Sequence, residues 1–362
     1  MILRTPRRLA AAVVATALCA GLAACGDDEN TLTPTGNTGL SGTVSGAGAS
    51  SQAAAMEAWI AAFTAQHSGV TVNYEPTGSG AGREQFSAGA IRFAGSDAPL
   101  KADELAKAKS VCVDVIQIPV YVSPIAIAFN LDGVTELNLR PDTVAKIFDQ
   151  KITRWNDAAI TADNPGVNLP DLEITPVNRS DESGTTENFT EYLKAAAPDA
   201  WPHEPSGDWP VPGGEAAQGT SGVVGAIQAG DGTIGYADAS QAGNLGTVKV
   251  AVGESFVGPS PEAAASILGA SERIADQGEF GFVYELDRAT DAAGTYPVVL
   301  VSYALACTRY GAQSDVDLVR AFLGWILSEE GQRTAQEAAG SAPLSAAQRT
   351  EFSAAVDAIR LK

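Results

Sequence analysis

Residues 174–190, ITPVNRSDESGTTENFT, run from a short apolar stretch through a polar turn into the start of a helix. The run over 174–177 is typical of a strand, and the helix is expected to begin near 183–186. Arg179 stands in the turn, although the whole chain carries a formal net charge of -20. A guanidinium and the unpaired N–H groups of a helix start both donate hydrogen bonds to anions. The stretch therefore predicts local capture of a small oxyanion at the end of a strand.

Strand and helix patterns alternate on both sides of this stretch. A helical pattern over 57–66 precedes a strand pattern over 70–76, and similar pairs recur along the 362 residues. The apolar run over 115–131 contains Pro119 and Pro124, which favours two separate strands. Alternation of this kind predicts an α/β protein whose sheets are covered on both faces. The length suits two or three domains.

The N-terminal residues 1–25 read MILRTPRRLAAAVVATALCAGLAAC, a basic segment followed by a short apolar one. This pattern predicts a secretory signal over 1–24, too short for a spanning helix. The small residues before Cys25 resemble a bacterial lipobox, so Cys25 is expected to become a lipidated N-terminus. The alternative is an ordinary cleavage site that has a cysteine beside it. Residues 25–41 are predicted to be a flexible tether, which places the protein outside the cytoplasm, anchored to the cell membrane.

The acidic balance of the chain limits its partners. The sequence has 43 Asp and Glu residues against 23 Lys and Arg residues. Such a charge repels nucleic acid and anionic membrane surfaces and favours solubility. We therefore expect no nucleic-acid partner, and contact with the membrane only through the lipid anchor.

Cys112 and Cys307 are the cysteines that remain after Cys25. Outside the cytoplasm two such thiols usually pair, and each lies at the end of a strand-like run, so a disulfide is expected. Two separate buried thiols are the alternative. The chain has only two histidines, His67 and His203, and no clustered Cys-x-x-Cys motif, so no metal site is predicted.

Glycine-containing turns precede three of the expected helices, and each carries serine or threonine. Glycine lets an anion approach the backbone, and the hydroxyl groups add donors. Any one of these turns alone is more typical of a plain helix N-cap. Together with Arg179 they predict convergence on one ligand. Their candidate residues are Ser50, Ser51, Ser79, Ser183, Gly184 and Thr185.

Asp97 follows Gly95-Ser96 at the end of another predicted strand. A carboxylate repels most anions, but it accepts a hydrogen bond from an anion that keeps a proton. Phosphate near neutral pH keeps at least one proton, whereas sulfate keeps none, so Asp97 favours phosphate. The alternative is that Asp97 caps the turn before Pro99. Asp181 is predicted to hold Arg179 in place, unless the two form only a surface ion pair.

The chain resembles the substrate-binding protein of the phosphate ABC importer, a periplasmic phosphate-binding protein family. Similar motifs are GAGASSQ over 46–52, IRFAGSDAPL over 91–100 and VNRSDESGTTENFTEYL over 177–193. The family has an aromatic residue where this chain has Ser51, and a proline where it has Gln52. Phosphate contacts are implied, by matching position, from Ser50, Ser51, Ser79, Asp97, Arg179, Ser183, Gly184 and Thr185.

The resemblance implies a two-lobed type II (Venus-flytrap) binding-protein fold with two crossovers between the lobes. Lobe I is expected over 42–118 plus 298–362, and lobe II over 119–297. Cys112 and Cys307 would then both lie in lobe I, near the crossovers. The lobes are expected to close on phosphate by a hinge motion and to present it to the membrane subunits of an ABC importer. A monomer without a cofactor is expected.

Three other functions are weighed against phosphate import. A phosphatase would need a base for Ser183, and neither His67 nor His203 has a supporting context, so an enzyme is not expected. A binder of another oxyanion is disfavoured by Asp97. A tethered phosphate sensor remains an alternative that the residues do not separate from a transport protein.

Overall fold

The computed structural model describes residues 39–275 and 277–362. The predicted signal, Cys25 and most of the predicted tether therefore lie outside the described residues. The helices are α1 (Ala53–Gln66), α2 (Ser79–Ser87), α3 (Ala102–Cys112), α4 (Pro141–Phe148), α5 (Ala158–Asp163), α6 (Gly184–Ala196), α7 (Gly219–Ala229), α8 (Pro261–Ala270), α9 (Gln313–Ile326), α10 (Glu329–Ala339) and α11 (Ala346–Asp357), with a short 3₁₀ helix η1 (Ala239–Gln241).

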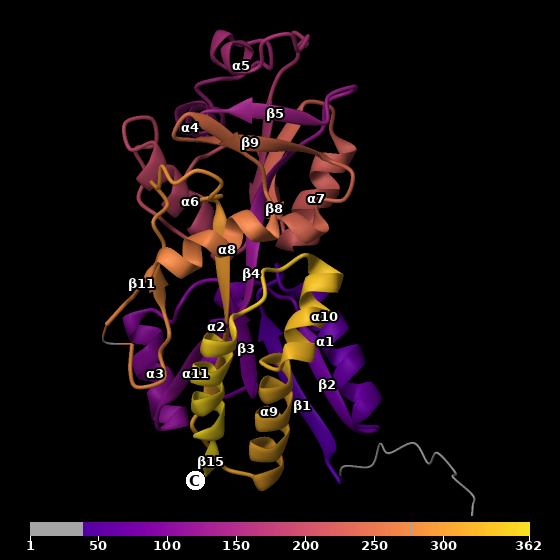
Figure 1. Cartoon of the computed structure of the whole chain (residues 1–362), viewed down its shortest axis with the longest axis vertical. Helices are drawn as coiled ribbons and strands as arrows, with labels where there is room; N and C mark the ends of the chain where they lie inside the picture. Colours follow the sequence, from indigo (N-terminus) through magenta and orange to yellow (C-terminus); the bar gives the residue numbers. More distant parts are fainter. Residues whose placement is uncertain (1–38, 276) are drawn as a thin grey trace, which may run out of the picture. The chain divides into compact units, whose positions relative to one another are not determined.

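The strands alternate with these helices, as Figure 1 shows, which confirms the predicted α/β class. The strands are β1 (Ser41–Gly48), β2 (Gly69–Glu75), β3 (Phe93–Ser96), β4 (Val115–Phe129), β5 (Glu136–Leu139), β6 (Thr175–Arg179), β7 (Glu215–Ala217), β8 (Thr233–Asp238), β9 (Gly246–Val252), β10 (Ser255–Val257), β11 (Glu272–Arg273), β12 (Tyr284–Glu285), β13 (Val299–Cys307), β14 (Arg309–Tyr310) and β15 (Arg360–Leu361). Among the described residues no helix is both long and apolar enough to cross a membrane.

Two groups of strands share β4. The first has the order β2-β1-β3-β13-β4, and the second continues as β4-β8-β6-β7, with β9 also on β4. Lobe I is the part of the protein built on the first group, and lobe II is the part built on the second. Strands β1, β2 and β3 run parallel, and so do β6, β7 and β8. Each lobe therefore brings several carboxyl ends of strands to one edge, where α/β proteins bind ligands. The residue numbers at which one lobe gives way to the other stay a prediction.

The long apolar run forms one strand, so the prediction of two strands was wrong. β4 continues from Val115 to Phe129 without a break. Pro119 faces Tyr303 next to a register shift at which β4 has one extra residue, and Pro124 faces Val299 at the end of that pairing. From Ile125 onward β4 pairs with β8 instead. Both prolines lie where the ladder changes, which is where a residue without an N–H group is tolerated.

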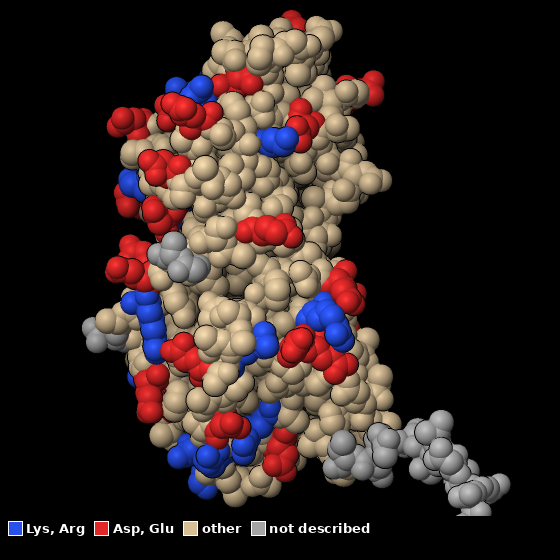
Figure 2. All heavy atoms as spheres, viewed as in Figure 1, with Lys and Arg blue, Asp and Glu red and all other residues tan. Residues whose placement is uncertain are grey.

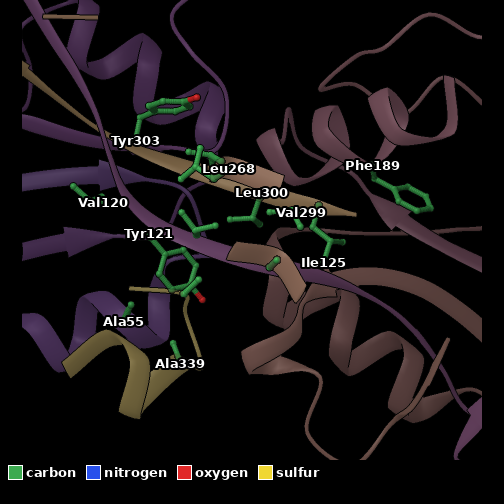
Figure 3. Close-up of a cluster of buried hydrophobic side chains, with 14 of the residues drawn as sticks. Ala55, Val120, Tyr121, Ile125, Phe189, Leu268, Val299, Leu300, Tyr303 and Ala339 are labelled. Atoms are coloured by element: carbon green, nitrogen blue, oxygen red, sulfur yellow. The ribbon is translucent and has the colours of Figure 1, made fainter. Parts of the chain in front are cut away.

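The crossing of β4 and β13 lies in the hydrophobic core. Tyr121 and Ile125 of β4 lie close to Val299 and Leu300 of β13 in Figure 3, and all four side chains are at most 1% exposed. Because every residue of β4 and β13 is buried, both faces of these strands are covered. The connection between the lobes is therefore a packed, apolar element rather than a loose linker.

A disulfide joins Cys112, at the end of α3, to Cys307, at the end of β13. The predicted pairing is confirmed, and the alternative of two separate thiols was wrong. The two cysteines are 195 residues apart in sequence, so the bond closes a very long loop in the unfolded chain.

Replacing both cysteines (Cys112→Ser with Cys307→Ser) is expected to lower the free energy of unfolding by about 3–5 kcal/mol, because the open chain regains loop entropy. Denaturant titration of both proteins measures the difference. The reduced wild type should match the variant, and the variant itself should not respond to reductant. Equal stability of oxidised wild type and variant would contradict the prediction.

Candidate functional site

The candidate site is built from strand ends of both lobes. In lobe I, β1 leads to Ser50 and Ser51, and β3 leads directly to Asp97. In lobe II, β6 ends at Arg179, and α6 begins at Gly184. Helices α1, α2, α6 and α7 all start along these edges, so several positive helix ends and free N–H groups are directed at one region.

Asp97 is the centre of the hydrogen bonds at this edge. The Ser51 hydroxyl donates to Asp97 Oδ1 at 2.7 Å, and the Thr185 hydroxyl donates to Oδ2 at 3.0 Å. The backbone N–H of Asp97 donates to Ser79 Oγ at 3.1 Å. Ser51 and Ser79 belong to lobe I and Thr185 to lobe II, so Asp97 joins the two lobes. Its side chain is only 3% exposed.

The surroundings of Asp97 decide how easily it ionises. Burial raises the pKa of the Asp97 carboxyl above its usual range. The hydroxyl hydrogen bonds and the positive charge of Arg179 oppose that rise without cancelling it. The result is a buried carboxyl group that is poised to share a proton with a ligand.

Arg179 and Asp181 form a bidentate ion pair. Arg179 Nε donates to Asp181 Oδ1 at 2.8 Å, and its Nη2 donates to Oδ2 at 2.5 Å. The Gly219 N–H adds a third hydrogen bond to Asp181 Oδ1 at 3.0 Å. Burial opposes ionisation of Asp181, but Arg179 outweighs it and holds the pKa of the carboxyl below its usual range. Arg179 is 4% exposed, so Asp181 fixes a buried cation beside the site.

Two glycines allow the lobes to meet. A Cβ on Gly184 of α6 would lie 2.7 Å from Asp97 Cβ and 2.8 Å from Ser79 Oγ. Gly78 has φ of +99°, and a Cβ there would lie 2.4 Å from Asp181 Oδ2. Since these contacts join residues of different lobes, only glycine lets the two walls approach this closely.

The other predicted residues reach the same edge in different ways. Ser50 Oγ lies 3.0 Å from Thr220 Oγ1 and accepts the Thr220 N–H at 3.1 Å. Ser183 Oγ accepts the Thr186 N–H at 3.2 Å and so caps α6. The eight predicted ligands are all buried: Ser50, Ser51, Ser79, Asp97, Arg179, Ser183, Gly184 and Thr185.

Sequence reasoning missed several residues at the site. Ser302 of β13 donates to Asp97 Oδ1 at 2.5 Å, and Gln241 donates to the carbonyl oxygens of Ser50 and Ser51. A serine inside the apolar run VLVSYALAC was a signal that pointed to Ser302. Gln241 carried no comparable local signal. Thr220, near the start of α7, was not among the predicted residues.

A group of ion pairs spans the lobes beside the site. Glu182 of lobe II lies 2.9 Å from Arg83 and 2.6 Å from Lys101, both in lobe I. The Arg83 side chain is 1% exposed and also pairs with Glu104 at 3.0 Å. Burial opposes ionisation of Glu182, but Lys101 and Arg83 hold its pKa below its usual range. Because each of these pairs joins one lobe to the other, separation of the lobes would break them.

Glu182→Gln is therefore expected to speed dissociation of the bound anion about two- to fivefold, the size of a partly exposed ion pair. The effect should shrink as salt is added, because salt screens the charges. Stopped-flow fluorescence measures the rate. Glu204→Gln is a matched control, because Glu204 pairs with Lys194 inside lobe II. Equal rates for wild type and Glu182→Gln at low salt would contradict a role in closure.

Charged side chains of both signs lie on the face drawn in Figure 2. Acidic side chains are spread over both ends of the face drawn in Figure 2, with Lys and Arg side chains beside many of them. Cavities of about 500 and 520 Å³ at the boundary of the lobes reach Asp97 and Ser50, respectively, and residues of both lobes line each of them. Within the site, Arg179, the hydroxyl groups and the helix ends are the groups that attract an anion.

Known proteins are similar to this chain in sequence and in fold. A family model described as the PBP superfamily domain matches residues 33–330. The chain is 36% identical over 331 residues to phosphate-binding protein PstS 3 of Mycobacterium leprae, which covers 86% of this chain and 89% of the relative. It is 34% identical over 356 residues to phosphate-binding protein PstS 2 of Mycobacterium tuberculosis, which covers 93% of this chain and 95% of the relative.

A solved structure gives the same result for the fold. The high-affinity periplasmic phosphate-binding protein PfluDING, bound with phosphate, aligns with a TM-score of 0.71 at 22% identity. The alignment covers 86% of this chain and 93% of that one. The predicted two-lobed binding-protein fold is confirmed.

Proposed function

Because this chain belongs to the PBP superfamily and, within it, to the family of the PstS phosphate-binding proteins, we propose that it binds inorganic phosphate between its lobes and delivers it to an ABC importer. The observation that carries the proposal is the convergence of both lobes on Asp97. Ser51 of lobe I contacts both oxygens of its carboxyl group, and Thr185 of lobe II donates to Oδ2. Such a site closes around a ligand small enough to fit between the two walls.

Phosphate suits the chemistry of the proposed ligands. The Arg179 guanidinium supplies the positive charge, and hydroxyl and backbone N–H groups supply neutral donors. Asp97 accepts the proton that phosphate retains near neutral pH. Sulfate has no such proton to donate and would place a second negative charge beside Asp97, which disfavours it strongly. The proposed ligands are Ser50, Ser51, Ser79, Asp97, Arg179, Ser183, Gly184 and Thr185, with Asp181 as support for Arg179.

The proposal includes the setting of the protein in the cell. Lipidation of Cys25 would hold a monomer at the outer side of the cell membrane on the tether over 25–41. Opening would separate lobe I, over 42–118 plus 298–362, from lobe II, over 119–297. The membrane subunits of the importer would recognise the closed form. The relatives are named as binding proteins, which supports binding without catalysis.

Titration calorimetry tests the proposal. The full chain, purified in mild detergent, is freed of bound phosphate by partial unfolding and refolding. Phosphate is expected to release heat with tight, one-to-one binding, and sulfate is expected to give none at the same pH. Absence of phosphate binding by refolded protein with native circular dichroism would overturn the proposal.

A phosphatase is the second function to exclude. His203 Nε2 lies 2.9 Å from Asp149 Oδ1, so the ring is hydrogen-bonded within lobe II rather than to Ser183. Incubation of the same protein with an aryl phosphate ester is expected to release no phenol. Steady release that is lost in Ser183→Ala would replace the binding proposal with an enzymatic one.

A further inference from the structure

Two buried residues outside the proposed ligand set form a chain that ends on Asp97. Gln52 Nε2 donates to Ser302 Oγ at 2.5 Å, and Ser302 Oγ donates to Asp97 Oδ1 at 2.5 Å. Gln52 and Ser302 are fully buried, and Asp97 is 3% exposed. The three residues come from the start of α1, the middle of β13 and the end of β3, so the fold brings them together from distant positions.

The direction of these hydrogen bonds follows from proton counting. A serine hydroxyl has one proton, and Ser302 gives it to the Asp97 carboxylate. Ser302 therefore has only lone pairs left for Gln52, which must turn its NH₂ group toward it. This orientation leaves Gln52 Oε1 buried without a hydrogen-bond partner. An unpaired buried carbonyl group is costly. We infer that the hydrogen bond from the Gln52 NH₂ group to Ser302 Oγ offsets this cost and holds the amide in this orientation.

The pairing of β13 with β4 is irregular beside Ser302. The register between β13 and β4 shifts between Ser302 and Tyr303, where Pro119 interrupts the ladder. The extra residue is Val120 of β4, and bulges often lie next to functional sites. On the other side of β13, Tyr303 pairs with Ser96, the residue before Asp97.

We propose that Gln52 and Ser302 are positioning residues that keep Asp97 ionised and occupy its Oδ1, so that Oδ2 receives the proton of bound phosphate. This inference rests on the proposed function, and it assigns part of the choice between phosphate and sulfate to residues that do not touch the anion. Ser51 and Thr185, which also donate to Asp97, are free to turn toward the ligand because each can exchange one hydroxyl partner for another.

The groups around Asp97 determine whether loss of Ser302 raises or lowers the pH at which Asp97 takes up a proton. Arg179 of β6 favours the ionised carboxyl, and Tyr74 of β2 is the neutral titratable group near it. Burial raises the pKa of Asp97, and the hydrogen bond from Ser302 opposes that rise. Without Ser302 the carboxyl takes up a proton at a higher pH. A protonated Asp97 can donate to sulfate, which an ionised Asp97 is expected to repel.

The test measures phosphate affinity, and competition by sulfate, between pH 5 and 8 in the full chain. Ser302→Ala is expected to bind phosphate about tenfold more weakly and to admit sulfate at a pH about one unit higher than wild type, the size of a hydrogen bond to a charged group. Ser302→Thr should restore both properties. Gln52→Leu should shift both in the same direction as Ser302→Ala, by a smaller amount.

Ser123→Ala is the matched control, because Ser123 is another fully buried serine on a central strand and is hydrogen-bonded to Pro124 rather than to Asp97. Its sulfate profile should stay that of wild type. Wild-type phosphate affinity and an unshifted sulfate profile in Ser302→Ala would overturn the inference. If Ser302→Ala fails to fold, the phosphate affinity and the sulfate profile of Gln52→Leu test the inference instead. A wild-type protein that binds no phosphate would instead overturn the proposed function.

Discussion

Asp97→Asn is expected to lower phosphate affinity about tenfold and to bring sulfate affinity to within about tenfold of phosphate affinity. The asparagine amide keeps the shape of the carboxyl and can still accept through one atom, but its NH₂ group now donates to the anion. Sulfate then gains a hydrogen bond and loses a repelling charge. Competition titrations with both anions at pH 7.5 measure the ratio.

The same variant is expected to be more stable than wild type when no phosphate is present. Burial raises the pKa of Asp97, so the folded protein holds this proton more tightly than the unfolded chain does. The ionised carboxyl therefore costs stability, and the cost grows as the pH rises from about 4 through the raised pKa. Asparagine removes that cost, so the gain should be present at pH 7 and should vanish toward pH 4.

Thermal unfolding of phosphate-free protein across this pH range tests the stability effect. Asp149→Asn serves as a control with the opposite sign, because hydrogen bonds from Lys151 and His203 outweigh burial and lower the pKa of Asp149. That control should lose stability at pH 7. Continued exclusion of sulfate by folded Asp97→Asn would show that selection of phosphate does not depend on a hydrogen bond from the ligand's proton to Asp97.

Local patterns predicted the parts of the site that are close in sequence. The turn from Arg179 to Thr185 combines a strand end, an arginine and a helix start within a few residues, and each has its own local signature. Asp181 pairs with Arg179 because the two are neighbours along the turn. Ser79 and Asp97 were found in the same way, from the strand-to-helix turns that carry them.

Contacts between distant segments could not be predicted from such patterns. Ser302 lies 205 residues from Asp97, and Thr220 lies 170 residues from Ser50. Their meeting depends on how β13 and α7 are placed against the first strands, which no local period encodes. The continuity of β4 was missed for a related reason. A proline breaks a strand only if its missing N–H group is needed, and that depends on the partner strand.

Gly184→Ala is expected to weaken phosphate binding more than a hundredfold while leaving each lobe folded. The added methyl group would lie 2.7 Å from Asp97 Cβ and 2.8 Å from Ser79 Oγ, closer than real Cβ contacts. Both atoms belong to lobe I, and Gly184 belongs to lobe II. The clash therefore arises only when the lobes come together, and the open form has no such conflict. Overpacking of this size costs about 1–3 kcal/mol where neighbours can shift, and more here because backbone lies behind the contact.

Calorimetry gives the affinity of Gly184→Ala, and small-angle scattering with saturating phosphate reports whether the lobes close. Gly225→Ala is the matched control, because Gly225 lies in α7 of lobe II and a Cβ there meets nothing within 4 Å. Alanine should even favour that helix slightly. Circular dichroism and the unfolding temperature of phosphate-free Gly184→Ala should match wild type, because the strain needs the closed form. Tight phosphate binding by Gly184→Ala would mean that the ligand does not sit between Asp97 and α6, and the proposed site itself would then be wrong.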